Sequence, residues 1–245
     1  MKIDIVVSCV WFQRRLCWQL SSLLQQVGAP ELEVDVAYVR NNGNPNTESV
    51  CSFFRSQGLK IRETVYQSME GIQCRGDVRN HQLAKSEADW IVFADTDMAY
   101  DPLFFADLGK QLEGELREET KCIHGRRISL DKQYCKDFFN SPFHPYRYPC
   151  VVNDVAEQLS NWPIFQISRP IGAGYFHLAN VKVLREKFGG VYLPPDERQD
   201  RAWGYQSDKR FRNRLGGVRV IDTKPQYHLN HERDNEEGCH LEMQR

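Results

Sequence analysis

The sequence lacks an excess of charge of either sign. It has 32 Lys and Arg against 33 Asp and Glu, a formal net charge of -1 over 245 residues. No global electrostatic field therefore attracts nucleic acid, and a bound anion must be held by local groups. Long apolar runs are also missing, because Asp4 interrupts the short run at the start of the chain. We expect no signal peptide, no membrane span and no nucleic-acid partner.

Paired cysteines and glycine-rich loops are absent as well. The eight cysteines stand singly, without a Cys-x-x-Cys pair, which argues against a zinc ribbon or a redox motif. Reduced core thiols, Cys9 and Cys17 among them, are the expectation, and they favour a cytoplasmic location. The segment after the first predicted strand, residues 8–13, contains no glycine, and no Gly-x-Gly-x-x-Gly follows any strand. These absences disfavour a sugar-nucleotide nucleotidyltransferase and a Rossmann dehydrogenase.

Strands and helices alternate regularly along the first hundred residues. A chain of this length can bury one substantial core, so a single domain is predicted. Apolar periodicity and turn formers predict strands at 3–10, 34–39 and 60–64, helices at 14–27, 47–57 and 76–85, and a further strand at 90–94. This alternation is typical of an α/β fold with a mostly parallel sheet and right-handed crossovers.

The second half of the chain is less regular. A helix to about residue 117, a strand at 122–128, a strand and turn at 167–177, helices at 180–187 and 207–215 and a last strand at 218–221 are predicted. Residues 138–162 are rich in aromatics and prolines, and we interpret them as a loop or short hairpin that forms part of the wall of a substrate site. The tail from Tyr227 is polar and is expected to become ordered only around a ligand.

The predicted strand at 90–94 ends in two carboxylates, Asp95 and Asp97, separated by Thr96. Ligands bind at the carboxyl ends of strands in open α/β sheets, and residues two apart on an extended chain share a face. The two carboxylates should therefore meet at a cleft, where a hard cation such as Mg²⁺ or Mn²⁺ would relieve their repulsion. An ordinary acidic turn is the alternative. Ala99 stands where a dehalogenase-type phosphatase would have threonine or a similar residue.

Over roughly residues 3–232 the chain resembles glycosyltransferases of family 2 type with the GT-A fold. The resemblance rests on five sequence blocks that occur in the same order as in that family. The blocks are residues 5–26, Val39-Arg40-Asn41-Asn42-Gly43, Arg79-Asn80, Asp95-Thr96-Asp97, and Gly172-Ala173-Gly174 followed by a helix and Phe188-Gly189-Gly190. The resemblance implies one GT-A domain over 1–245, with a nucleotide-binding half at 1–100, an acceptor and catalytic half at 101–226 and a polar tail at 227–245. It also implies metal-dependent, inverting transfer from a nucleotide-diphosphate sugar, with a UDP-sugar expected, to a hydroxyl of a glycan or related acceptor.

The same resemblance implies a set of site residues. Mn²⁺ or Mg²⁺ would be held by Asp95, Asp97 and His228, with His231 in reserve. Arg79 would add positive charge near the diphosphate. The other implied donor-site residues are Ser8, Cys9, Val10, Asn41, Thr96, Gly172, Ala173 and Gly174, with Arg169 and residues 138–148 framing donor sugar and acceptor. Asn41 replaces the aspartate that usually contacts the base, and because its amide both donates and accepts, the base is left open.

The catalytic segment of the family is similar to Trp203-Gly204-Tyr205-Gln206-Ser207-Asp208. Alignment on Arg214-Leu215 makes Asp208 the general base, whereas alignment on Trp203-Gly204 selects Ser207, and a serine is no general base. We prefer Asp208 for that reason. In a purely structural role, Ser207 caps a helix and Asp208 complements the helix dipole and pairs with Arg212.

Several charged and metal-ligating side chains also fit structural roles. Arg75 and Arg79 could be surface cations, and Lys209, Arg210, Arg212 and Arg214 could form a solvated helix face. His228, His231 and Cys239-His240 could hold structural zinc, although their spacing matches no standard pattern. A non-catalytic nucleotide or sugar-binding module, and a retaining enzyme of the same fold, are the competing functional hypotheses.

Overall fold

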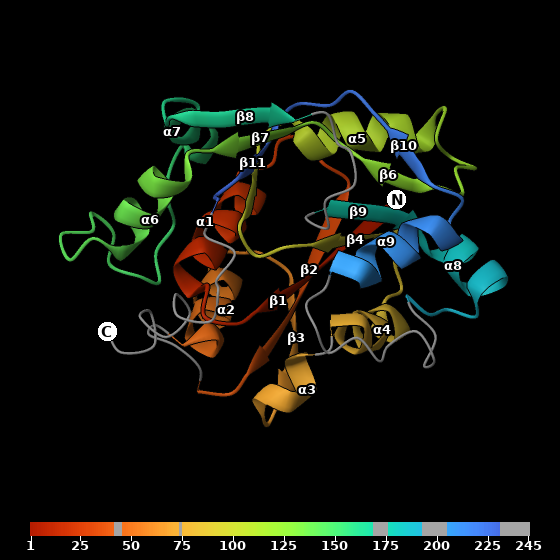
Figure 1. Cartoon of the computed structure of the whole chain (residues 1–245), viewed down its shortest axis with the longest axis horizontal. Helices are drawn as coiled ribbons and strands as arrows, with labels where there is room; N and C mark the ends of the chain where they lie inside the picture. The colour runs from red at the N-terminus through yellow and green to blue at the C-terminus, as the bar shows by residue number, and fades with distance from the viewer. Residues whose placement is uncertain (42–45, 74, 169–175, 193–204, 231–245) are drawn as a thin grey trace.

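A computed structural model describes residues 1–41, 46–73, 75–168, 176–192 and 205–230 (Figure 1). The elements of the first half are β1 (Lys2–Cys9), α1 (Gln13–Leu24), β2 (Glu31–Val39), α2 (Thr47–Ser56), β3 (Ile61–Tyr66), α3 (Met69–Gln73), α4 (Arg75–Lys85), β4 (Trp90–Ala94) and β5 (Met98–Tyr100). The elements of the second half are α5 (Phe104–Glu113), β6 (Cys122–His124), β7 (Arg127–Leu130), α6 (Lys132–Asn140), α7 (Val155–Ser160), β8 (Ile164–Ser168), β9 (Phe176–Asn180), α8 (Val181–Phe188), α9 (Tyr205–Arg214), β10 (Val218–Val220) and β11 (Gln226–His228).

A seven-stranded central sheet has the order β10-β6-β9-β4-β1-β2-β3. Its four amino-terminal strands are parallel, as predicted, with β1 between β2 and β4 and with β3 beside β2. β9 runs antiparallel to both β4 and β6. The carboxyl ends of β1, β2 and β4 therefore lie at one edge of the sheet, which is where the acidic segment after β4 was expected.

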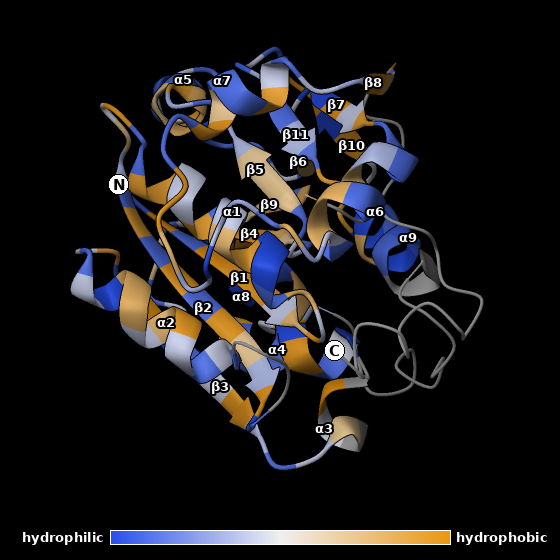
Figure 2. Ribbon diagram, turned by 90° about the vertical axis from the view of Figure 1, so that its left-hand side faces the viewer, coloured by the Kyte–Doolittle hydropathy of each residue, from blue (hydrophilic) through white to orange (hydrophobic). Residues whose placement is uncertain are grey.

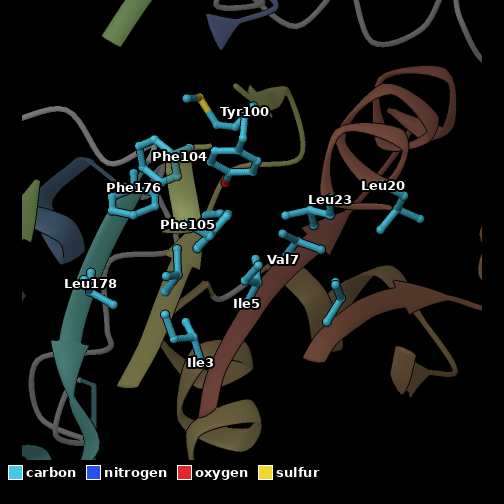
Figure 3. Packing of buried hydrophobic residues seen from close by; sticks show 14 of the residues in the cluster. Ile3, Ile5, Val7, Leu20, Leu23, Tyr100, Phe104, Phe105, Phe176 and Leu178 are labelled. Carbon is cyan, nitrogen blue, oxygen red and sulfur yellow. The ribbon is translucent and has the colours of Figure 1, made fainter. Parts of the chain in front are cut away.

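Alternating side chains of the central strands fill two separate cores. Ile3, Ile5 and Val7 of β1 belong to a cluster with α1, α2 and α5, and Figure 3 shows them along β1, with Val7 nearest to Leu23 of α1. The intervening side chains of the strands pack with α4, α8 and α9, which gather at the right of Figure 1. Each fully buried side chain of this size contributes roughly 1.5–3 kcal/mol to stability. In Figure 2, β4 is predominantly hydrophobic and α9 predominantly hydrophilic.

A second, four-stranded sheet has the order β5-β11-β7-β8 and lies at the top of Figure 1. The segment 138–162 beside it was predicted to be a loop or short hairpin, and this is wrong, because it contains the end of α6 and all of α7. The aromatic side chains of this segment surround the buried Trp18 of α1. Its ring lies 5.5 Å from Phe138 and 5.2 Å from Trp162, measured between centroids. Burial of these rings against α1, rather than apolar periodicity, stabilises this segment.

Several boundaries differ from the predictions. α1 ends at Leu24 rather than at Val27, because the backbone N–H of Val27 donates to the carbonyl oxygen of Pro102 at 2.9 Å. The single strand predicted at 122–128 is two strands in different sheets, β6 and β7. Tyr227, expected to open a polar tail, is buried in β11. α9 begins at Tyr205, so Ser207 is not its N-cap.

The short elements α3, β5 and β11 were not predicted. The strand and turn predicted at 167–177 overlap only the end of β8 (Ile164–Ser168) and the start of β9 (Phe176–Asn180) among the described residues. The helices predicted at 76–85 and 180–187 are confirmed as α4 and α8, and Asn180 caps α8 by accepting from the backbone N–H of Val183. No helix among the described residues combines the length and apolar character that crossing a bilayer requires.

Candidate active site

The acidic segment after β4 is pinned to two neighbouring elements. The hydroxyl of Thr96 donates to the carbonyl oxygen of Ser8 at 2.7 Å, and the Gln19 amide donates to the carbonyl oxygen of Asp95 at 2.9 Å. Thr96 and Asp97 are buried, whereas the Asp95 side chain is 30% exposed. The predicted carboxylates therefore occupy a fixed turn at the carboxyl end of β4, with Asp95 at its accessible side.

His228 meets Asp97 through strand pairing in the smaller sheet. β11 runs antiparallel to β5 with His228 opposite Met98, and the backbone N–H of Leu229 donates to the carbonyl oxygen of Asp97 at 2.8 Å. The Nε2 atom of His228 lies 2.9 Å from Oδ2 of Asp97. The structure thus brings these two predicted metal ligands together. His231, the reserve ligand, lies outside the described residues.

Arg79 of α4 lies between the acidic turn and α9. Its buried guanidinium is 3.7 Å from Oδ1 of Asp95, donates to the Tyr192 hydroxyl at 2.6 Å and forms a short ion pair with Asp208. Burial acts to lower the pKa of Arg79, but Asp208, Tyr192 and Asp95 together raise that pKa above its usual value. Arg79 therefore stays charged, and it is not a surface cation.

Asp208 is buried in the first turn of α9. Its Oδ1 atom accepts hydrogen bonds from Arg79 and, at 2.7 Å, from Tyr192. Arg212 contacts the backbone carbonyl oxygen of Asp208 at 3.2 Å rather than its carboxylate. Burial raises the pKa of Tyr192, so this residue donates as a neutral phenol. The carboxylate of Asp208 is thus held by a cation and a hydroxyl.

The basic residues of α9 do not form a uniformly solvated face. Arg212 is only 7% exposed, and Arg214 donates to the carbonyl oxygen of Tyr192 at 2.9 Å. Lys209 is exposed. α9 therefore directs part of its positive charge toward the protein interior beside Asp208.

Charges of both signs surround Asp95. Burial and then the charge of Asp97 raise the pKa of Asp95, while Arg75 and Arg79 act to lower it. Arg75, with 47% of its side chain exposed, lies 3.6 Å from Asp95. A divalent ion would relieve the repulsion between the two carboxylates. Carboxylates and an imidazole are ligands suited to Mn²⁺, and carboxylates also suit Mg²⁺. The structure shows the contact between Asp97 and His228, whereas the ligand atoms of Asp95, Asp97 and His228 do not all lie within 4.8 Å of one another.

The residues expected around base and ribose lie at the ends of β1 and β2. Asn41 follows β2, is exposed and has a positive φ of 59°. Val10 packs beside a small buried cluster, and the carbonyl oxygen of Ser8 holds the Thr96 hydroxyl. Cys9 is fully buried and its Sγ accepts from the Thr47 hydroxyl at 3.7 Å, so its side chain belongs to the core.

Part of the predicted donor site falls where the structure gives no description. Arg169, Gly172, Ala173, Gly174 and the pair Trp203-Gly204 lie outside the described residues, as do Cys239 and His240.

Sequence reasoning missed Tyr192, Gln19 and His177. Tyr192 joins Arg79 to Asp208, Gln19 fixes the acidic turn, and Nδ1 of His177 lies 3.8 Å from Oδ1 of Asp208. These contacts join residues far apart in the chain, and none has a local pattern that would have revealed it.

The architecture, a large central sheet flanked by helices, is similar to that of TarS and PcManGT, and the predicted α/β fold class is confirmed. Staphylococcus aureus TarS 1-349 superposes with a TM-score of 0.60 at 16% identity, over 93% of this chain and 60% of that one. Its complex with UDP-GlcNAc gives a TM-score of 0.59 at 15% identity, over 96% of this chain and 60% of that one. The mannosyltransferase PcManGT from Pyrobaculum calidifontis, in complex with GDP-Man and Mn²⁺, gives a TM-score of 0.57 at 17% identity. The superposition covers 98% of this chain and 59% of that one.

At such low identities the likeness establishes the fold alone. The chain spans about 60% of the length of these structures. No protein-family model matches the sequence, and a search of curated proteins finds no match.

Proposed function

We propose that the protein is a metal-dependent glycosyltransferase that moves a sugar from a nucleotide-diphosphate sugar to a hydroxyl of a glycan or related acceptor. The observation that carries the proposal is the acidic turn after β4, with Asp97 in contact with His228 and Asp95 in contact with Arg79. Solved structures with this fold include complexes with UDP-GlcNAc and with GDP-Man and Mn²⁺. A UDP-sugar is the first donor to test.

Asp95, Asp97 and His228 would hold Mn²⁺ or Mg²⁺, which would act as a Lewis acid on the diphosphate leaving group. Arg79 and the half-exposed Arg75 would add fixed positive charge on the same side. Ser8, Val10 and Asn41 would contact the ribose and base, with Thr96 supporting the donor site. Gly172, Ala173, Gly174, Arg169 and residues 138–148 are proposed to frame the donor sugar and acceptor.

Asp208 is the proposed general base. It would accept the proton of the acceptor hydroxyl while that oxygen bonds to the anomeric carbon and the bond from this carbon to the diphosphate breaks, which inverts the configuration. Its ion pair with Arg79 gives it a second role, because it also orients the cation that faces Asp95. Arg79 and Tyr192 both contact Oδ1 of Asp208, so Oδ2 is the oxygen that would accept the proton.

A nucleotide or sugar-binding module is the second candidate function. The observation that favours it is the engagement of the buried Asp208 carboxylate by Arg79 and Tyr192, since a carboxylate held in this way can be purely structural. A binder would retain the donor site and lack turnover.

Turnover of a panel of nucleotide sugars with Mn²⁺ distinguishes the two functions. The proposed enzyme hydrolyses at least one donor slowly, or transfers its sugar to an acceptor found by screening. Calorimetry on the same panel reports binding separately. Tight, Mn²⁺-dependent binding without hydrolysis or transfer would establish the binding module, and the absence of binding would contradict both functions.

A further inference from the structure

A second group of metal-ligating side chains lies beneath α9, on the sheet face opposite α1. Cys122 and His124 come from β6 and His177 from β9, and all three are fully buried. One potential ligand atom from each lies within 4.8 Å of those of the other two. β6 and β9 are antiparallel with Ile123 opposite Leu178, which places His124 across from His177. Cys122, two residues from His124, shares that face.

His177 has the hydrogen-bond arrangement of a metal ligand. Its Nδ1 atom faces the Tyr192 hydroxyl at 3.4 Å and lies 3.8 Å from Oδ1 of Asp208. Its Nε2 atom is buried and has no hydrogen-bond partner among the described residues. A metal-bound histidine commonly turns its second ring nitrogen toward a carboxylate or another polar group, which fixes the tautomer.

We propose that Cys122, His124 and His177 bind one Zn²⁺ ion at a site separate from the one formed by Asp95, Asp97 and His228. A thiolate and two imidazoles are ligands that zinc prefers, whereas Mn²⁺ and Mg²⁺ prefer oxygen. These three residues leave the fourth position of a tetrahedral site for water. Since the residues are inaccessible in the folded protein, zinc enters during folding.

The charge of the surroundings is compatible with such an ion. Burial lowers the pKa of His124 and of His177, which keeps both imidazoles neutral, the form that binds metal. Burial raises the pKa of the Cys122 thiol, but a coordinated thiol is deprotonated by the ion itself. The thiolate and the nearby Asp208 offset the positive charges of Arg79 and Arg212, both of which act on His177.

The ion would cross-link two strands at a weakly paired position. β6 has three residues, and it borders β9, which carries His177 beside Asp208. Zinc there would fix the sheet on which α9 rests and would orient His177 beneath the Asp208 carboxylate. This inference does not depend on the proposed transferase activity.

Zinc content and cobalt substitution test the site directly. The full chain is expressed with added zinc, purified without chelators or a metal-affinity column, and analysed by mass spectrometry for metals. The proposal predicts about one zinc per chain, together with a thiolate-to-metal absorption band after refolding with Co²⁺. Cys122→Ser and His177→Gln should each lose at least about tenfold in zinc occupancy. Cys135→Ser, which alters a buried cysteine in another cluster, and Asp97→Asn should retain it.

The wild-type cobalt spectrum keeps the test decisive if a core variant fails to fold. Zinc far below one per chain with no cobalt–thiolate band in the folded wild type would overturn the proposal. Zinc that survives both Cys122→Ser and His177→Gln would also overturn it.

Discussion

Arg79 is the residue through which the parts of the candidate site are connected. It contacts Asp95 at the end of β4, Tyr192 after α8 and Asp208 on α9. In a buried network of this kind, removing one member leaves the others with unsatisfied charge. Variants of the site will therefore change stability as well as activity, and each needs both measurements.

Asp208→Asn tests the proposed base. Asparagine retains the shape and can hydrogen-bond to Arg79 but cannot accept a proton, so we expect transfer to fall by about 10²-fold or more with donor affinity nearly unchanged. Loss of a charge beside Arg79 should also lower the free energy of unfolding by about 1–3 kcal/mol. Steady-state transfer, calorimetry and chemical denaturation measure the three quantities.

Ser207→Ala is the matched control, because the competing alignment selects Ser207. It should transfer sugar at a near-normal rate. Near-normal transfer by Asp208→Asn would remove the base assignment and favour an upstream carboxylate, such as Asp200, Glu197 or Asp196, or a retaining mechanism.

Arg79→Gln and His228→Gln test the proposed diphosphate side of the donor site. Both residues lie beside the acidic turn, so each variant should weaken UDP binding by roughly tenfold or more, about 1.4 kcal/mol, and uridine binding much less. His81→Gln on the exposed side of α4 is the control. Equal losses for UDP and uridine would show that the two residues support the fold or contact the base.

At the scale of elements, α4 is positioned by the buried Gln82. Its side-chain amide donates to the carbonyl oxygens of Val7 at 3.2 Å and Asp35 at 2.8 Å, which ties the helix to β1 and β2. Arg79 lies one helical turn earlier on α4, so the same hydrogen bonds fix its position.

Gln82→Leu should therefore destabilise the protein by about 1–3 kcal/mol, since it leaves buried carbonyl groups without their donor. It should also weaken binding of UDP with Mn²⁺ by displacing Arg79. The urea midpoint measures the first effect and calorimetry the second. If Gln82→Leu were as stable as His81→Gln and bound UDP with unchanged affinity, Gln82 would not position α4.

The predictability of the elements followed the strength of local patterns. β4 was identified because five consecutive apolar residues end in Asp95, and α8 because its buried Val181 and Leu184 lie one helical turn apart. β5 and β11 have three residues each, too few to show a period. α6 was missed because its apolar side chains are aromatic rings that pack around Trp18, a contact over more than a hundred residues.

The residues of the candidate site were likewise predictable only where a local pattern or the family resemblance indicated them. Asp95 and Asp97 stand in a recognisable local context at the end of β4, Arg79 was suggested by the family resemblance, and the structure places Arg79 beside Asp95. His228 was suggested by resemblance alone, and only the pairing of β5 with β11 brings it to Asp97. Tyr192 and His177 become part of the site only through packing of α9 on the sheet.

At the scale of the whole molecule, two sheets converge on one edge. The central sheet supplies Asp95 at the end of β4, and the smaller sheet supplies His228 from β11. The short connection through Asp97 joins them, so a cation at this edge would hold the two sheets together. Ligands of open α/β sheets bind at the carboxyl ends of the strands, and this is the edge at which we propose the donor site.

The most direct test of the central claim is a calorimetric titration of UDP and GDP into the protein, with Mn²⁺ and with EDTA. We predict binding at least about tenfold tighter with Mn²⁺, a dependence lost in Asp95→Asn and Asp97→Asn and retained in the control Asp107→Asn on α5. All variants should keep the circular dichroism spectrum of the folded protein. Equal affinity with Mn²⁺ and with EDTA, or an unchanged Mn²⁺ dependence in both acidic-turn variants, would contradict the metal-dependent donor site.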